Sequence, residues 1–93
     1  MEVIYRLIFF KDALKDINYW KKSGNKQASN KIQKILEVLE QNPHGPTPGE
    51  PEMLKYTTGY SRRITKKDRI TYDINDVTKE VIIFRMRGHY NDK

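Results

Sequence analysis

The chain has 93 residues and no cysteine, and its two histidines, His44 and His89, lie far apart. Disulfide bonds and thiolate metal sites are therefore excluded, and the sequence predicts neither a metal site nor a cofactor. No apolar run approaches the ~20 residues that a membrane-spanning helix needs. A charge interrupts the short apolar run at the start of the chain, which is not typical of a signal peptide. We expect a cytoplasmic protein without a membrane segment.

Glycine and proline are few, and their positions are informative. The five glycines form no glycine-rich phosphate loop, whereas all four prolines fall between residues 43 and 51. A segment with so many prolines cannot be regular structure. It is too short to separate domains, so it predicts an ordered loop within one domain that covers residues 1–93.

Positive charge exceeds negative charge. Lysine and arginine number 18 and acids 12, which leaves a net charge of +6 and favours an anionic partner, with nucleic acid first. Residues 55–69 contain six Lys/Arg and one acid, a balance of +5. Most of the net charge therefore lies in one short segment.

The first half of the chain predicts a strand followed by two helices. Residues 3–10 are β-branched and aromatic, apolar enough for a central strand. Residues 11–22 predict a helix whose apolar side is Leu14, Ile17 and Trp20, and Ser23-Gly24-Asn25 ends it. Residues 26–41 predict a second helix, so the two helices form an antiparallel hairpin. The apolar stripe of the second helix consists of Ala28, Ile32, Ile35, Leu36 and Leu39.

The second half predicts strands. Residues 60–74 form a β-hairpin about the turn Lys66-Lys67-Asp68, and a last strand runs near residues 79–86. We therefore predict an α+β fold in which the helical hairpin packs on one face of a mainly antiparallel sheet, in the order β-α-α-β-β-β.

Arginines of the hairpin are candidate phosphate ligands. Strand alternation places Arg63 and Arg69 on a polar, open face and puts Arg62 on the opposite face with Tyr60 and Ile64. A guanidinium offers a planar fork of donors that suits phosphate. We include Arg62 and Arg87 among the expected substrate-binding residues. For each of these arginines the alternative is a solvated strand residue.

Two further residues could supply acid–base chemistry. Metal-free cleavage of RNA needs a base for the 2′-hydroxyl, cations for the phosphate and an acid for the leaving 5′-oxygen. Glu52, where the proline-rich loop enters the strands, is a candidate base; an ordinary surface glutamate is the commoner alternative. His89 is a candidate acid and Tyr90 a candidate stacking platform, against the alternative of a solvated tail.

Five short segments and one further arginine resemble the Txe/YoeB-type toxins of the RelE/ParE superfamily. They are Arg6-Leu7-Ile8-Phe9 with Tyr19-Trp20, Pro51-Glu52-Met53-Leu54-Lys55, Ser61-Arg62-Arg63-Ile64-Thr65 with Arg69, and His89-Tyr90. The resemblance implies a ribosome-dependent mRNA endonuclease that acts in the A site, with a YefM/Phd-type antitoxin as its partner. We also expect that two copies of the chain can form a homodimer.

The same resemblance implies roles for individual residues. Glu52 would be the base and Arg69 would stabilise the transition state. Arg63 and Lys55 would contact phosphates, and His89 and Tyr90 would provide the acid and position the substrate.

Two other functions are compatible with the sequence. A ParE-like gyrase inhibitor would have the same fold but would need no acid–base pair. A non-catalytic basic module that binds RNA or the ribosome would need the arginine and lysine face, but neither Glu52 nor His89.

Overall fold

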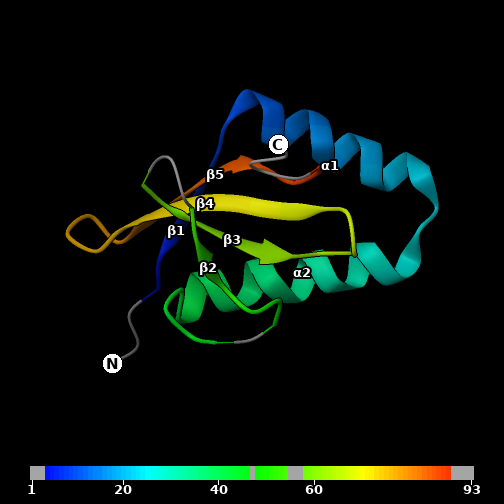
Figure 1. The fold of residues 1–93 in the computed structure, drawn as a ribbon. Helices are drawn as coiled ribbons and strands as arrows, with labels where there is room; N and C mark the ends of the chain where they lie inside the picture. Colours follow the sequence, from blue (N-terminus) through cyan, green and yellow to red (C-terminus); the bar gives the residue numbers. More distant parts are fainter. Residues whose placement is uncertain (1–3, 47, 55–57, 89–93) are drawn as a thin grey trace.

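The computed structural model describes residues 4–46, 48–54 and 58–88 (Figure 1). The predicted site residues Lys55, His89 and Tyr90 lie outside these described residues. Across the described ranges, none of the helices combines the length and the apolar character that crossing a bilayer requires.

The predicted α+β fold is confirmed, and one short strand adds to the predicted order. The elements are β1 (Arg6–Phe9), α1 (Lys11–Ser23), α2 (Lys26–Gln41), β2 (Glu52–Met53), β3 (Tyr60–Arg63), β4 (Arg69–Asn75) and β5 (Glu80–Arg85). The sequence did not predict β2, because two residues are too few to show alternation. This strand matters because it begins at the candidate base, Glu52.

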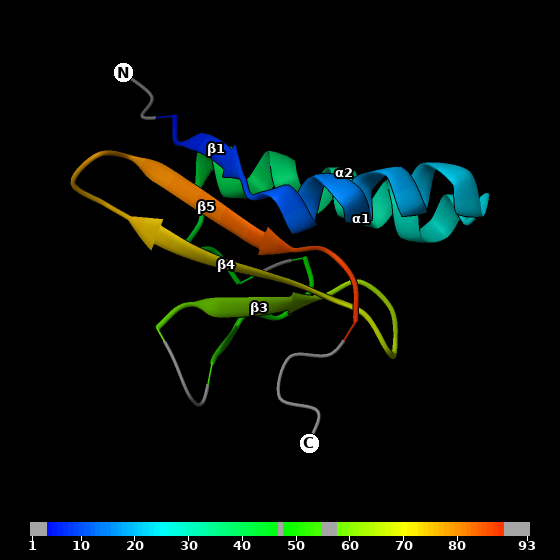
Figure 2. The same ribbon diagram turned by 90° about the horizontal axis from the view of Figure 1, so that it is seen from above.

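The five strands form one mixed sheet in the order β1-β5-β4-β3-β2. Only the β1–β5 pair is parallel, and the other pairs are antiparallel. The prediction of a central first strand was wrong, because β1 lies at an edge (Figure 2). Its apolar residues Leu7 and Phe9 pack against the core. Apolar content reports burial of the faces of a strand, and it does not report how many neighbours the strand has.

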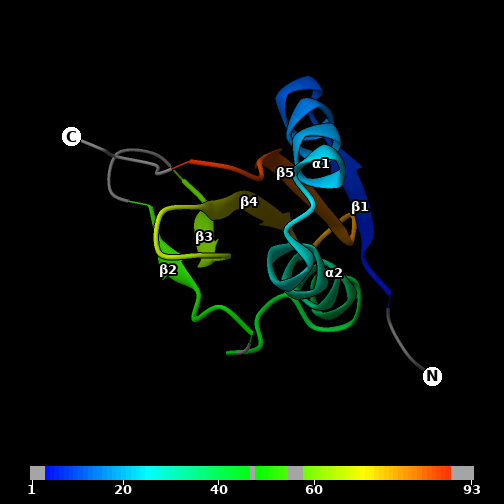
Figure 3. The same ribbon diagram turned by 90° about the vertical axis from the view of Figure 1, so that its right-hand side faces the viewer.

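A junction of two residues, Gly24 and Asn25, ends α1 and begins α2. Gly24 closes α1 in the left-handed region at φ +74°, a conformation that glycine adopts without strain. Asn25 then caps α2, because its side-chain oxygen accepts a hydrogen bond from the backbone N–H of Ala28 at 3.0 Å. The chain therefore reverses within the predicted stop. Figure 3 shows both helices on the side of the molecule that carries β1, away from β2.

A single core joins the helices to one face of the sheet. The α2 stripe contributes as predicted, and the sheet supplies Ile70, Tyr72, Val81 and Ile83. The predicted face of α1 was partly wrong, since Leu14 is exposed and Asp16 is buried. Asp16 is buried because its carboxylate accepts hydrogen bonds from Arg85 and Met86 at the end of β5. On the opposite face, β3 and β4 carry the polar side chains of Arg63 and Arg69.

Candidate functional site

The polar face of the sheet brings two arginines together. Arg63 on β3 pairs directly with Arg69 on β4, so both side chains leave the sheet on the same face, as predicted. Like charges directly opposite each other are unfavourable in an antiparallel pair. Such a pair is best compensated by an anion, either from the protein or from a ligand.

Glu52 provides a carboxylate at this face. It pairs with Ser61 across β2 and β3, and its Oε1 lies 3.9 Å from Nη1 of Arg69. The Glu52 side chain is 63% exposed, whereas that of Arg69 is only 17% exposed. An ion pair this long and this open contributes little stability, about 0–1 kcal/mol. The carboxylate is therefore accessible to solvent beside a recessed guanidinium.

The chain just before His89 is attached to the same corner. The N–H of Gly88 donates to Oδ1 of Asp68 at 2.8 Å, and the N–H of Arg69 donates to the carbonyl of Gly88 at 3.0 Å. The last described residue is thus hydrogen-bonded to Arg69 itself. The sequence predicts Asp68 only as a turn residue. No local signal pointed to its contact with a segment 20 positions away.

Arg62 does not fit its predicted place among the substrate-binding residues. Its side chain is fully buried, and Nε donates to the hydroxyl of Tyr72 at 2.8 Å. Burial raises the pKa of Tyr72, and the Arg62 hydrogen bond opposes this rise. The remaining guanidinium nitrogens donate to the carbonyl oxygens of Pro43, Gly45 and Pro48.

These contacts hold the described residues of the proline-rich loop, 43–46 and 48–51, against β3. Besides the Arg62 bonds, the N–H of Arg63 donates to the carbonyl of Gly49 at 2.8 Å. Gly49 has φ +92°, and a Cβ there would lie 3.0 Å from the carbonyl oxygen of Arg63, so the loop lies tightly against β3. Because the loop leads directly into Glu52, Arg62 helps to place the candidate base. The sequence offered one signal for this role: Arg62 shares the face of Tyr60 and Ile64.

Arg87 is exposed and lies over α1. Its Cζ is 4.0 Å from the ring centroid of Tyr19, a cation–π contact. The guanidinium keeps access to solvent, so its predicted role in substrate binding stays a prediction. Within the described part of the chain, no group of three or more His, Asp or Glu side chains is arranged to hold a metal ion.

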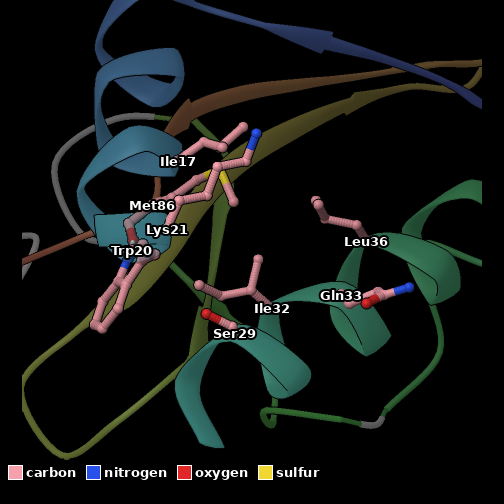
Figure 4. Close-up of a pocket in the computed structure, with 8 residues that line it drawn as sticks. All are labelled: Ile17, Trp20, Lys21, Ser29, Ile32, Gln33, Leu36 and Met86. Atoms are coloured by element: carbon pink, nitrogen blue, oxygen red, sulfur yellow. Dashed lines mark hydrogen bonds between the residues drawn. The ribbon is translucent and has the colours of Figure 1, made fainter. Parts of the chain in front are cut away.

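A groove between the two helices has different chemistry from this polar face (Figure 4). This groove of about 220 Å³ is lined mainly by apolar side chains, among them Ile17 and Trp20 of α1, Ile32 and Leu36 of α2, and Met86. It contains neither a carboxylate nor an arginine. The polar face around Glu52 and Arg69 is therefore the candidate site.

Comparisons with known proteins agree on one family. Residues 9–90 match the family described as YoeB-like toxin of bacterial type II toxin-antitoxin system. Toxin YoeB of Escherichia coli O6:H1 is 31% identical over 87 residues, covering 91% of this chain and 99% of that protein. The YoeB/ParE toxin from Agrobacterium tumefaciens has a similar structure, with a TM-score of 0.80 at 24% identity over 91% and 99% of the two chains. A chain of the YoeB-YefM complex from Staphylococcus aureus gives a TM-score of 0.76 at 31% identity over 92% and 98%.

Proposed function

The chain belongs to the YoeB-like toxin family of bacterial type II toxin–antitoxin systems, and from this premise we propose that it is a ribosome-dependent mRNA endonuclease. It cleaves mRNA in the ribosomal A site in the cytoplasm and so inhibits translation. One observation carries the proposal: the open carboxylate of Glu52 lies 3.9 Å from the recessed guanidinium of Arg69. A base next to a fixed cation is what attack on a phosphodiester needs.

The proposed reaction uses only groups of this chain and of the RNA. Glu52 takes the proton of a 2′-hydroxyl, whose oxygen attacks the adjacent phosphorus. Arg69 stabilises the negative charge that grows on the phosphoryl oxygens. The bond to the 5′-oxygen breaks as His89 gives that oxygen a proton, which leaves a 2′,3′-cyclic phosphate and a 5′-hydroxyl. Arg63 and Lys55 hold neighbouring phosphates, and Tyr90 positions a base by stacking.

The partner of the toxin is proposed on charge and on family. The chain carries a net +6, and an acidic segment of a YefM/Phd-type antitoxin would complement it. The family member from Staphylococcus aureus has been solved as a YoeB-YefM complex and as a YoeB dimer. We propose that the antitoxin segment covers Arg63 and Arg69 and so blocks RNA, and that a homodimer can form.

Single-turnover cleavage of mRNA on programmed ribosomes tests the proposal. Glu52→Gln and His89→Gln each remove one proton transfer, so each should lower the cleavage rate by about 10²–10⁴-fold while ribosome binding is retained. Arg69→Ala should lower the rate as well. Glu50→Gln is the matched control, since it changes an exposed acid two positions from Glu52.

Two outcomes would favour the alternatives. Near-wild-type cleavage by both Glu52→Gln and His89→Gln would overturn the assignment of the acid and the base. Ribosome binding without cleavage by the wild type would favour a non-catalytic binding module, and inhibition of gyrase would favour a ParE-like function.

A further inference from the structure

After β5, α1 holds the backbone of the chain. The carboxylate oxygen Oδ2 of Asp16 accepts hydrogen bonds from the N–H of Met86 at 2.9 Å and from Nε of Arg85 at 3.0 Å. The indole N–H of Trp20 donates to the carbonyl of Met86 at 2.7 Å. Both polar groups of the Met86 backbone are therefore occupied, and Met86 itself is fully buried. These contacts with α1 fix the direction in which the chain continues after Met86.

Two residues later, at Gly88, the chain is hydrogen-bonded to the turn between β3 and β4. Asp68 uses both carboxylate oxygens: Oδ1 accepts from the N–H of Gly88 at 2.8 Å, and Oδ2 accepts from the hydroxyl of Thr65 at 2.8 Å. The Thr65 oxygen in turn accepts from the backbone N–H groups of Lys67 and Asp68. The Asp68 carboxylate is thus oriented before it meets Gly88.

Gly88 needs such an anchor. Its φ is +84°, a conformation that favours glycine, and a glycine backbone is the most flexible of all. Without an external hydrogen bond, the direction of the chain after Gly88 would be poorly defined. The N–H of Gly88 has the Asp68 carboxylate as its partner, and its carbonyl accepts from the N–H of Arg69.

We infer that Asp68 is a positioning residue for RNA cleavage: its carboxylate fixes Gly88 beside Arg69 and so sets the point from which His89 and Tyr90 extend. The inference rests on the proposed function, because it needs His89 as the acid. Asp68 touches neither the RNA nor the reacting atoms in this role. Misplacement of a reacting group by about 1 Å can lower a rate by about 10²-fold, so the anchor affects the rate of the chemical step.

Two variants separate the hydrogen bond from the charge. Asp68→Ala removes the acceptor for Gly88 and should lower the single-turnover rate by about 10- to 100-fold with ribosome binding unchanged. Asp68→Asn keeps one side-chain oxygen for the Gly88 N–H and loses the charge together with the acceptor for the Thr65 hydroxyl, so it should recover part of the rate. Asp73→Ala is the control for charge, since Asp73 lies on β4, five positions after Asp68, and bonds to other groups.

A double-mutant cycle shows whether Asp68 acts through the tail. If it does, adding Asp68→Ala to His89→Gln should lower the rate little further, because coupled residues give non-additive effects. A general folding defect would instead lower the rate by the same factor in both backgrounds. Full additivity would therefore overturn the inference.

Hydrogen exchange of the backbone amides tests the hydrogen bond of Gly88 without a measurement of activity. A sample labelled with ¹⁵N-glycine has five backbone signals, one for each glycine in the chain. Asp68→Ala should speed hydrogen exchange at Gly88, while Gly24 and Gly49 exchange as in the wild type. Unchanged exchange at Gly88 would overturn the inference even if activity fell.

The two proposals fail differently. A wild type that needs His89 for cleavage, together with a fully active Asp68→Ala variant, would overturn the positioning role alone. Cleavage by His89→Gln at the wild-type rate would overturn the assignment of the acid, and the positioning role with it. A wild type that does not cleave mRNA on the ribosome would overturn the proposed function itself.

Discussion

At the scale of single residues, Arg62 and Arg63 are sequence neighbours in opposite environments. Arg62 is fully buried and donates to three loop carbonyls and to Tyr72, whereas Arg63 is exposed. Arg62→Met should lower the free energy of unfolding by about 3 kcal/mol, because buried acceptors lose a charged donor. Arg63→Met should stay within about 0.5 kcal/mol of the wild type. Urea unfolding followed by circular dichroism measures both.

Equal stability of the two variants would contradict the structural role of Arg62. The comparison is well matched, because both substitutions replace arginine by the same apolar side chain at adjacent strand positions.

Asp76 belongs to a second polar cluster, at the opposite end of β4 from Arg69. The hydroxyl of Tyr5 donates to Oδ1 of Asp76 at 2.6 Å, and Nε2 of His44 lies 2.9 Å from the same oxygen. The hydrogen bond from Tyr5, and then that from His44, lower the pKa of Asp76. A carboxyl with a depressed pKa in the folded state binds more protons after unfolding, so its stabilising effect is lost as pH falls.

Asp76→Asn should therefore be less stable than the wild type near neutral pH and should lose less stability on acidification. The pH window in which the wild type loses this stabilisation lies below the ordinary carboxyl pKa of about 3.9 and extends down to the lower pKa of Asp76 in the folded state. Urea midpoints measured from pH 7 to pH 2 test this, with Glu37→Gln, an exposed acid on α2, as the control. Parallel pH curves for the wild type and Asp76→Asn would argue against the Asp76 contribution.

At the scale of elements, the junction at residues 23–25 sets the helical hairpin. Asn25 is the N-cap of α2, and its oxygen satisfies the free N–H of Ala28. Asn25→Ala should lower the free energy of unfolding by about 1 kcal/mol. Asn30→Ala, at an exposed position within α2, should be neutral or slightly stabilising, because alanine is the better helix former. Thermal unfolding compares the two, and an equal melting temperature would show that the cap is dispensable.

At the scale of the whole molecule, charge governs the encounter with RNA. Lys66 and Lys67 lie in the exposed turn next to the candidate site. Replacing both by alanine should weaken ribosome binding and flatten its dependence on salt, since each phosphate contact contributes about 0.7–0.9 to the slope of log K against log[salt]. The position of cleavage should not change. Alanine at Lys21 and Lys22, at the end of α1, removes the same charge and should affect the slope less.

A salt slope that is unaffected by the Lys66 and Lys67 changes would place the binding surface elsewhere. Binding that is flat between low and physiological salt would exclude a phosphate-dominated interface altogether.

The sequence by itself determined much of the local structure. The bounds of α2, the junction at Gly24 and Asn25, and the common face of Arg63 and Arg69 all follow from periodicity and from the preferences of single residues. These features depend on neighbours within one helical turn or one β-hairpin, so a local pattern is enough. The sequence also gives the net charge, and it allowed Glu52 and the arginines to be predicted as members of one candidate site.

Tertiary structure decided the rest. Whether β1 lies at the centre or at the edge depends on the order in which the strands pair in the sheet, and its apolar character is compatible with both positions. Arg62 finds carbonyls 14 to 19 positions earlier in the chain, and Asp68 meets Gly88 20 positions later. Such contacts depend on the directions in which separate segments approach each other. A pattern of residue types along one strand cannot specify those directions.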